Sequence, residues 1–248
     1  MDSKNGKYQL VFKPYGESAI LIEWPKKIDE NILTDIREFV QKIEHLKNKE
    51  IVDVNFVYNS LLIIYDNDLI KYQDLKNQLL NLYFKADYIK KTAKQIWYIP
   101  VCYDVKFGID LQLLASEKHC SLEKIINLHS SVNYTVYGIG FLPGFLYLGG
   151  LPNELEFPRK SNPRANVEKG SVAIGDNQTG IYPQNSPGGW NIIGKTPISI
   201  FDIKKVMPIE IESGDELKFY SISLKEFEEI EVGFKNGFYN LKNAILND

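Results

Sequence analysis

The chain has 248 residues, of which 44% are hydrophobic and 25% are charged, a balance typical of a globular protein with a substantial core. Its 29 basic and 32 acidic residues give a net charge of −3, which provides no basic field for nucleic acid or an anionic membrane. The start lacks the apolar segment of a signal peptide, and no run approaches the about 18 apolar residues of a membrane span, so we expect a cytoplasmic protein.

Up to residue 90, the sequence predicts a small α+β sandwich with the order β-β-α-β-β-α. Loosely alternating apolar residues predict the strands, and apolar residues spaced three and four apart predict two amphipathic helices. Asp29 is suited to cap the first helix. The expected elements are two strands within residues 8–24, a helix over residues 29–46, strands at 51–58 and 61–65, and a helix over residues 70–86.

A second domain is expected over residues 91–223, after a polar crossing. It begins with a strand at 95–103 and two short helices at 110–118 and 122–129. Short β-runs separated by glycine and proline turns then favour a β-barrel, and they cover residues 134–141, 171–175, 180–182, 191–193, 198–201, 209–212 and 216–221. Residues 224–248 form a C-terminal extension, expected to be a helix or a packed tail.

Loop-shaping residues are concentrated between Gly138 and Pro197, a stretch with 11 of the 17 glycines and 7 of the 11 prolines. Glycine permits positive φ and close approach of the backbone, whereas proline fixes φ. Aromatic residues are interspersed among these turns: Phe141, Phe145, Tyr147, Tyr182 and Trp190. Rigid turns with aromatic side chains predict a binding pocket.

Six short strings in this stretch carry a resemblance to a known family. They are FLPGFLYLGGL from Phe141, PRKSNPR from Pro158, GSVAI from Gly170, QTGIYP from Gln178, SPGGW from Ser186 and IGKTP from Ile193. With them the chain resembles the family of 5-oxoprolinase B subunits, also described as allophanate hydrolase subunit 1 domains. The resemblance runs from about residue 8 to about residue 222 and implies that the barrel is cyclophilin-like.

The resemblance implies a subunit of an ATP-dependent cyclic amide hydrolase. Such a complex opens the lactam of 5-oxo-L-proline to L-glutamate with the help of subunits C and A. This chain would be inactive alone, and the complex would use ATP. A relative in the family inhibits a sporulation sensor kinase, so a regulatory protein that docks on a histidine kinase stays open as an alternative. A component of urea or allophanate metabolism is the third.

Arg159 and Arg164 are candidates for holding a carboxylate or phosphate, because Pro158 and Pro163 hold the backbone around them and a guanidinium binds such groups in a fork. Arginines that tie loops together or contact a partner are the alternative. His129 is the best general base by residue type, and with Arg164 it completes the catalytic candidates. It lies on an apolar helix face, so a core histidine is its alternative role.

Two short loops supply the other candidates. Their amide, hydroxyl and backbone N–H groups can bind a substrate amide, and a tryptophan can form an aromatic wall. The alternative is rigid packing of the loops. The predicted substrate-binding residues, besides Arg159, are Gln178, Thr179, Tyr182, Ser186, Gly188, Gly189 and Trp190.

Residues 189–196 match the phosphate-loop pattern G-x-x-x-x-G-K-[ST]. A phosphate loop needs a helix after it, but Pro197 and a β-run follow here. We therefore expect these residues to form a strand and not a phosphate loop. No G-x-S-x-G motif or histidine-rich metal cluster is present, and Cys102 and Cys120 do not have a metal-binding spacing. We therefore expect no metal site, and a catalytic constellation that a partner completes.

Overall fold

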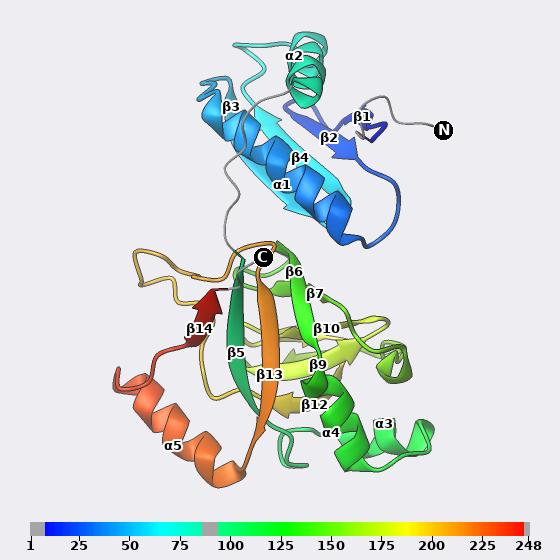
Figure 1. The fold of residues 1–248 in the computed structure, drawn as a ribbon, viewed down its shortest axis with the longest axis vertical. Coiled ribbons are helices and arrows are strands. Elements are labelled where there is room, and N and C mark those ends of the chain that lie inside the picture. The colour runs from blue at the N-terminus through cyan, green and yellow to red at the C-terminus, as the bar shows by residue number, and fades with distance from the viewer. Residues whose placement is uncertain (1–7, 86–93, 246–248) are drawn as a thin grey trace. The chain divides into compact units, whose positions relative to one another are not determined.

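The computed structural model describes residues 8–85 and 94–245, and the chain divides into two compact units, Met1–Thr92 and Ala93–Asp248 (Figure 1). In the first unit the described strands pair antiparallel in the order β1-β2-β4-β3. This arrangement confirms the predicted α+β fold. The elements are β1 (Val11–Pro14), β2 (Ala19–Glu23), α1 (Glu30–His45), β3 (Ile51–Val57), β4 (Ser60–Tyr65) and α2 (Tyr72–Phe84).

The helices of this unit bury the apolar faces that their spacing predicted. The Asp29 side chain caps α1 by accepting hydrogen bonds from the N–H groups of Asn31 at 2.8 Å and Ile32 at 3.4 Å. Both helices and the sheet contribute to one core cluster, whose members include Ile20, Ile22, Ile36, Phe39, Leu61, Ile63, Leu75, Leu79 and Tyr83. Hydrophobic burial therefore holds this unit together.

The second unit is built around a closed β-barrel, as predicted (Figure 1). Its strands follow one another around the barrel in the order β6-β13-β5-β12-β9-β10-β7, and β7 pairs back to β6. Only the β13–β5 pair is parallel among these described strands. The strands are β5 (Gln95–Cys102), β6 (Asn133–Ile139), β7 (Leu146–Gly149), β9 (Ser171–Gly175), β10 (Gln178–Ile181), β12 (Asn191–Lys195) and β13 (Glu216–Ile222).

Helices and short strands surround the barrel. A two-stranded sheet pairs β8 with β11, and β14 pairs antiparallel with the first half of β5. On its β12 side, β5 pairs through Cys102 with Lys195, so β14 covers the part of the edge that β12 leaves open. These elements are α3 (Leu111–Glu117), α4 (Leu122–Ser131), η2 (Asn153–Leu155), β8 (Arg164–Val167), β11 (Ser186–Gly188), α5 (Leu224–Lys235) and β14 (Lys242–Ile245).

Two predicted strands are wrong. Residues 198–201 and 209–212 form irregular loop segments. Their apolar side chains Ile198, Ile200 and Ile211 are nevertheless buried in the barrel core, so the alternation that suggested strands reflects inward packing of a loop. Conversely, β7, β8 and β11 were not predicted, since each has only three or four residues and lies among glycines and prolines.

Asp215 fastens the start of β5 to the loop before β13. Its buried carboxylate accepts hydrogen bonds from the indole N–H of Trp97 at 2.8 Å and from the backbone N–H groups of Gln95 at 3.1 Å and Glu212 at 3.0 Å. A carboxylate with several N–H donors satisfies its charge inside a protein without a cation. This side chain therefore fixes the entry of the chain into the barrel.

Replacing Asp215 with Ala should lower the free energy of unfolding by about 3 kcal/mol, because three donors lose a charged acceptor. Chemical denaturation measures the loss. Asp202→Ala is the control, since that carboxylate accepts a hydrogen bond from the exposed Lys204 N–H at 3.0 Å, and it should cost less than about 1 kcal/mol. Equal losses in the two variants would show that Asp215 has no special structural role.

Candidate functional site

A cavity of about 260 Å³ lies in the second unit, where the glycine- and proline-rich loops meet. β7 supplies Tyr147 and β11 supplies Pro187 and Gly188, while the loops between strands supply the rest. The lining residues are Phe141, Phe145, Tyr147, Arg159, Lys160, Pro163, Tyr182, Pro187, Gly188, Gly189 and Trp190. The cavity therefore combines an aromatic wall with two cationic side chains.

Phe145 is the centre of the aromatic wall. Its ring makes edge-to-face contacts with Tyr147 at 5.3 Å, Trp190 at 5.6 Å and Tyr182 at 6.0 Å between ring centroids. Phe145, Tyr182 and Trp190 are all buried and form a small hydrophobic cluster with residues of β8, β9 and β12. The wall is therefore rigid and anchored to the barrel.

Two glycines make room for this wall. A Cβ atom on Gly175 would lie 2.5 Å from the indole of Trp190, and one on Gly188 would lie 2.3 Å from the hydroxyl oxygen of Tyr182. Non-bonded atoms do not approach this closely. Each ring can therefore occupy its position only because the neighbouring residue has no side chain. These glycines are required for close approach, in addition to any role in forming turns.

Phe141 stands at the cavity with an exposed side chain and an unusual backbone. The side chain is 74% exposed, and its φ of 64° lies in the left-handed region that a phenylalanine rarely adopts. The same loop contains Gly144, with φ of 81°, where a Cβ atom would lie 2.4 Å from that of Phe201. Strained residues of this kind cluster at ligand-binding and partner-binding sites.

Arg159 is oriented by two neighbours. Its Nε donates to Asp176 at 2.7 Å, and its guanidinium lies over the Trp190 ring at 5.6 Å from the centroid. Both members of this ion pair are about half exposed. Such an exposed pair contributes little to stability, so its main effect is to hold the guanidinium against the tryptophan.

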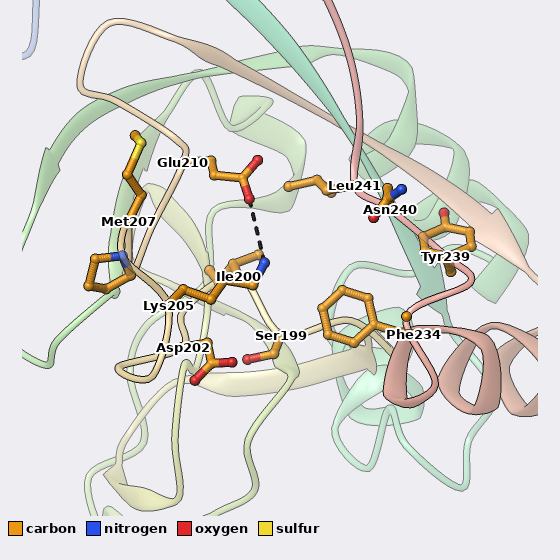
Figure 2. Close-up of a pocket in the computed structure, with 12 residues that line it drawn as sticks. Ser199, Ile200, Asp202, Lys205, Met207, Glu210, Phe234, Tyr239, Asn240 and Leu241 are labelled. Carbon is orange, nitrogen blue, oxygen red and sulfur yellow. Dashed lines mark hydrogen bonds and ion pairs between the residues drawn. The ribbon is translucent and has the colours of Figure 1, made fainter.

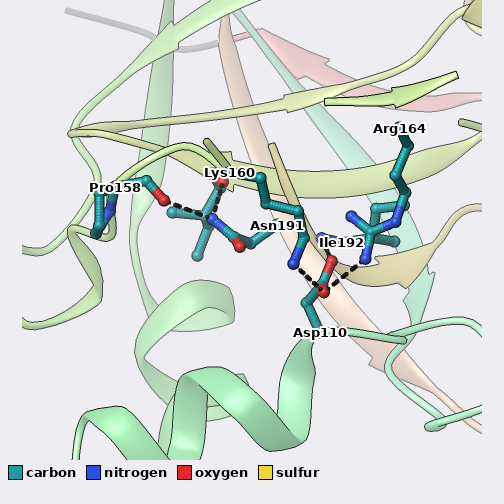
Figure 3. A network of polar contacts seen from close by, with 7 residues as sticks. Asp110, Pro158, Lys160, Arg164, Asn191 and Ile192 are labelled. Atoms are coloured by element: carbon teal, nitrogen blue, oxygen red, sulfur yellow. Dashed lines mark hydrogen bonds and ion pairs between the residues drawn. The ribbon is translucent and has the colours of Figure 1, made fainter. Parts of the chain in front are cut away.

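Asp110 is the centre of a second charged network (Figure 3). Its Oδ1 accepts from the Nη2 of Arg164 at 2.7 Å and lies 2.9 Å from the Nζ of Lys160, while its Oδ2 accepts from the Ile192 N–H at 2.8 Å. Burial opposes ionisation of this carboxyl, but the hydrogen bonds from Arg164, Lys160 and Ile192 outweigh it and lower the pKa of Asp110. Asp110 is therefore ionised at neutral pH.

The structure brings together five of the predicted site residues. Arg159, Tyr182, Gly188, Gly189 and Trp190 line the cavity. The other five predicted residues are not among the lining residues: Arg164 is bound to Asp110, Thr179 is bound to His129, Gln178 is half-buried at the start of β10, Ser186 is buried on β11, and His129 is in the barrel core.

His129 is fully buried, and both of its ring nitrogens have partners. The Thr179 hydroxyl donates to the carbonyl oxygen of Ala173 at 3.1 Å, so it accepts from the Nε2–H of His129 at 2.8 Å. Nδ1 then accepts from the Tyr103 hydroxyl at 2.7 Å. Burial lowers the pKa of His129 to about 3, so the ring is neutral at physiological pH.

Asp110 and Lys160 were not among the predicted site residues. Lys160 stands in the PRKSNPR string between two prolines, where its neighbours Arg159 and Arg164 attracted the prediction instead. Asp110 is 54 positions from Arg164 in the sequence and carried no motif. Only the folded chain brings it to the cavity loops.

The segment with the phosphate-loop pattern forms β12, which confirms the predicted strand. The Lys195 ammonium is paired with Glu168 at 2.6 Å. A Cβ atom on Gly194 would lie 2.8 Å from the side chain of Val101, so this backbone is pressed against β5. These residues do not fit a nucleotide phosphate, since no helix N-terminus follows them.

A second cavity, of about 360 Å³, lies between residues 199–210 and the C-terminal residues 234–241 (Figure 2). Lys205 and Glu210 form an ion pair of 3.5 Å there, and both side chains are about half exposed. Met207, Phe234 and Leu241 contribute apolar surface. None of the predicted site residues lines this cavity, so it is a weaker candidate than the aromatic one despite its larger volume.

Across residues 8–85 and 94–245, no group of three or more His, Cys, Asp or Glu side chains is arranged to hold a metal ion. No helix within these ranges is long and apolar enough to cross a membrane.

Comparison with known proteins identifies the family. The family model for the carboxyltransferase domain, subdomain C and D, matches residues 10–210. The 5-oxoprolinase B subunit of Bacillus subtilis is 34% identical over 235 residues, which cover 89% of this chain and 95% of that protein. The chain belongs to the family of 5-oxoprolinase B subunits.

Solved structures of other proteins share the fold of this chain. The protein TTHA0988 aligns with a TM-score of 0.72 and 29% identity over 83% of this chain. Urea carboxylase from Kluyveromyces lactis aligns with a TM-score of 0.82 over 98% of this chain, and at 20% identity it shows the fold alone. This chain covers 39% of TTHA0988 and 24% of the urea carboxylase, so each of those chains is much longer.

The ring of His129 should show the Nε2–H tautomer and should not titrate between pH 8 and about 5, because its folded-state pKa is about 3. Since the unfolded value is higher, near 6.5, the protein should lose stability as pH falls through this interval. Two-dimensional NMR of ¹⁵N-labelled histidine measures the tautomer and the titration, and denaturation at several pH values measures the stability. A His129 ring that titrates near pH 6.5 would contradict the buried network.

Gly175→Ala should lower the free energy of unfolding by about 3 kcal/mol, because the added methyl displaces Trp190. Gly189→Ala is the matched change: its Cβ would be 3.6 Å from the nearest atoms, and we expect it to cost less than about 1 kcal/mol. Denaturation followed by tryptophan fluorescence measures both. Equal stability of the two variants would show that the position of Trp190 does not require a glycine at residue 175.

Proposed function

We propose that this chain is the substrate-binding B subunit of an ATP-dependent 5-oxoprolinase complex, which hydrolyses 5-oxo-L-proline to L-glutamate together with subunits C and A. Three relatives that are named as B subunits of 5-oxoprolinase, at 34% to 37% identity, support this proposal. The structural observation that carries it is the cavity, in which aromatic rings and cations face one small space.

The cavity has the chemistry that this substrate needs. 5-Oxoproline is a small five-membered lactam with one carboxylate. Its ring packs on the aromatic wall of Tyr182 and Trp190, and its carboxylate faces the cations Arg159 and Lys160. The loop of Gly188 and Gly189 supplies backbone polar groups beside the lactam amide.

The cavity does not have a catalytic base. Among its lining residues, all of which the structure describes, there is no carboxylate, imidazole or thiol. Burial raises the pKa of Tyr182, so its hydroxyl stays protonated and donates a hydrogen bond rather than removing a proton from water. A partner subunit therefore supplies the group that activates water, and this chain alone is inactive.

Five predicted residues outside the cavity support the site in this proposal. Arg164 binds Asp110 and thereby anchors β8, while Thr179 and His129 tie β10 to α4 inside the barrel. Ser186 and Gln178 belong to the strands β11 and β10 that frame the loops. The complex uses ATP, and because β12 does not fit a phosphate, we assign no nucleotide-binding step to that segment.

The proposal is tested by measuring glutamate formation from 5-oxoproline and ATP, with this chain and candidate subunits A and C, omitting each in turn. Activity should require all three. Tyr182→Phe should lower kcat/KM about tenfold, because it removes one hydrogen bond to the lactam. Tyr220→Phe is the matched control, since the Tyr220 hydroxyl lies against that of Tyr239 at 3.1 Å, and it should retain full activity.

Other outcomes redirect the proposal. Turnover without this chain would remove it from the reaction. If the three chains assemble but do not open 5-oxoproline, other cyclic amides become the substrates to test. If the chains neither assemble nor turn over the lactam, inhibition of a sensor histidine kinase becomes the better hypothesis.

A further inference from the structure

Three cations stand near the aromatic cavity, and they differ in how their charges are balanced. Arg159 is paired with Asp176 and is 54% exposed. Arg164 and Lys160 share one carboxylate, that of Asp110, and their side chains are 26% and 23% exposed. The Asp110 network therefore carries two positive charges against one negative charge, in a largely buried position.

Three donors surround the single negative charge of Asp110. Both of its cationic partners approach Oδ1, at 2.7 Å for Arg164 and 2.9 Å for Lys160, while Oδ2 is occupied by the Ile192 N–H (Figure 3). Of the two cations, Lys160 lines the cavity and Arg164 does not, so a ligand in the cavity meets this network at Lys160. The network as a whole has one positive charge in excess.

Lys160 carries this surplus charge to the cavity. It is one of the lining residues, and its backbone N–H donates to the carbonyl oxygen of Gly189 at 2.7 Å, which fixes the loop that carries it. An excess of positive charge in a largely buried network is costly, so a site of this kind favours an anion.

We propose that Lys160 is the residue that selects an anionic ligand, a small ring compound with one carboxylate, and that Asp110 is its positioning residue. Asp110 balances one of its two cations, and the remaining positive charge meets the ligand through Lys160. Arg159, whose charge Asp176 already balances, packs on Trp190 and contributes to the wall. The inference deepens the proposed function and rests on it for the identity of the natural ligand.

Three probes separate the carboxylate from the lactam. 5-Oxoproline has both groups, 2-pyrrolidinone has the lactam alone, and cyclopentanecarboxylate has the carboxylate alone. Binding of each to the full chain is measured by NMR titration, and turnover of 5-oxoproline is measured in the three-subunit assay. The wild-type chain should bind both carboxylates more tightly than 2-pyrrolidinone.

Lys160→Gln should weaken binding of the two carboxylates at least about tenfold and change binding of 2-pyrrolidinone less than about twofold, because only a charge-assisted contact is lost. Lys205→Gln, in the second cavity, is the control and should leave all three affinities unchanged. If Lys160→Gln weakens the three probes equally, or weakens none, the inference is overturned.

Asp110→Asn tests the positioning role through the sign of its effect. It makes the network more positive, so an effect of charge alone would strengthen carboxylate binding. If Asp110 positions Lys160, carboxylate binding should instead weaken at least about fivefold relative to 2-pyrrolidinone. Circular dichroism confirms that the variant is folded, and Asp110→Glu should recover part of the affinity. Stronger carboxylate binding by Asp110→Asn would overturn the positioning role.

The outcomes for the inference and for the proposed function are distinguishable. Binding of cyclopentanecarboxylate that depends on Lys160, without turnover of 5-oxoproline, supports the anion site and rejects the oxoprolinase activity. Turnover of 5-oxoproline with an unchanged KM in Lys160→Gln supports the activity and rejects the anion site.

Discussion

The buried carboxylate of Asp110 is the interaction on which the arrangement of the cavity loops depends. It joins the start of α3 to β12 through Ile192, since Asp110 also donates its own N–H to the Ile192 carbonyl oxygen at 2.9 Å. Through Arg164 and Lys160 it holds β8 and the loop before it. Elements that are far apart in the sequence therefore meet at one ion, and its low dielectric surroundings make these bonds strong and their loss costly.

Much of the fold could be predicted from the sequence because it depends on local patterns. The order of strands and helices in the first unit, the cap of α1, and the strand in place of a phosphate loop are all confirmed. Their signals are apolar spacing and capping side chains, which act within a few residues. The loops at 198–201 and 209–212 show the limit, because buried isoleucines alternate there without pairing to a neighbouring strand.

The candidate site could be predicted from the sequence only in part. Arg159, Tyr182 and Trp190 could be found because rigid, aromatic loops point to a pocket. Lys160 and Asp110 could not be found in this way. What distinguishes them is the number of cations that bind the Asp110 carboxylate. That number depends on pairings across 50 and 54 positions of sequence, from Asp110 to Lys160 (160 − 110) and to Arg164, and no local pattern encodes it.

The pairing of β14 with β5 has a consequence for the solubility of the chain. β12 meets β5 through a single residue pair at Cys102, and β14 covers residues 95–98 of the same strand. An uncovered strand edge offers free N–H and C=O groups to any other extended chain. β14 therefore protects this edge against edge-to-edge association. A protein shortened before Lys242 would expose an unpaired strand edge that promotes aggregation.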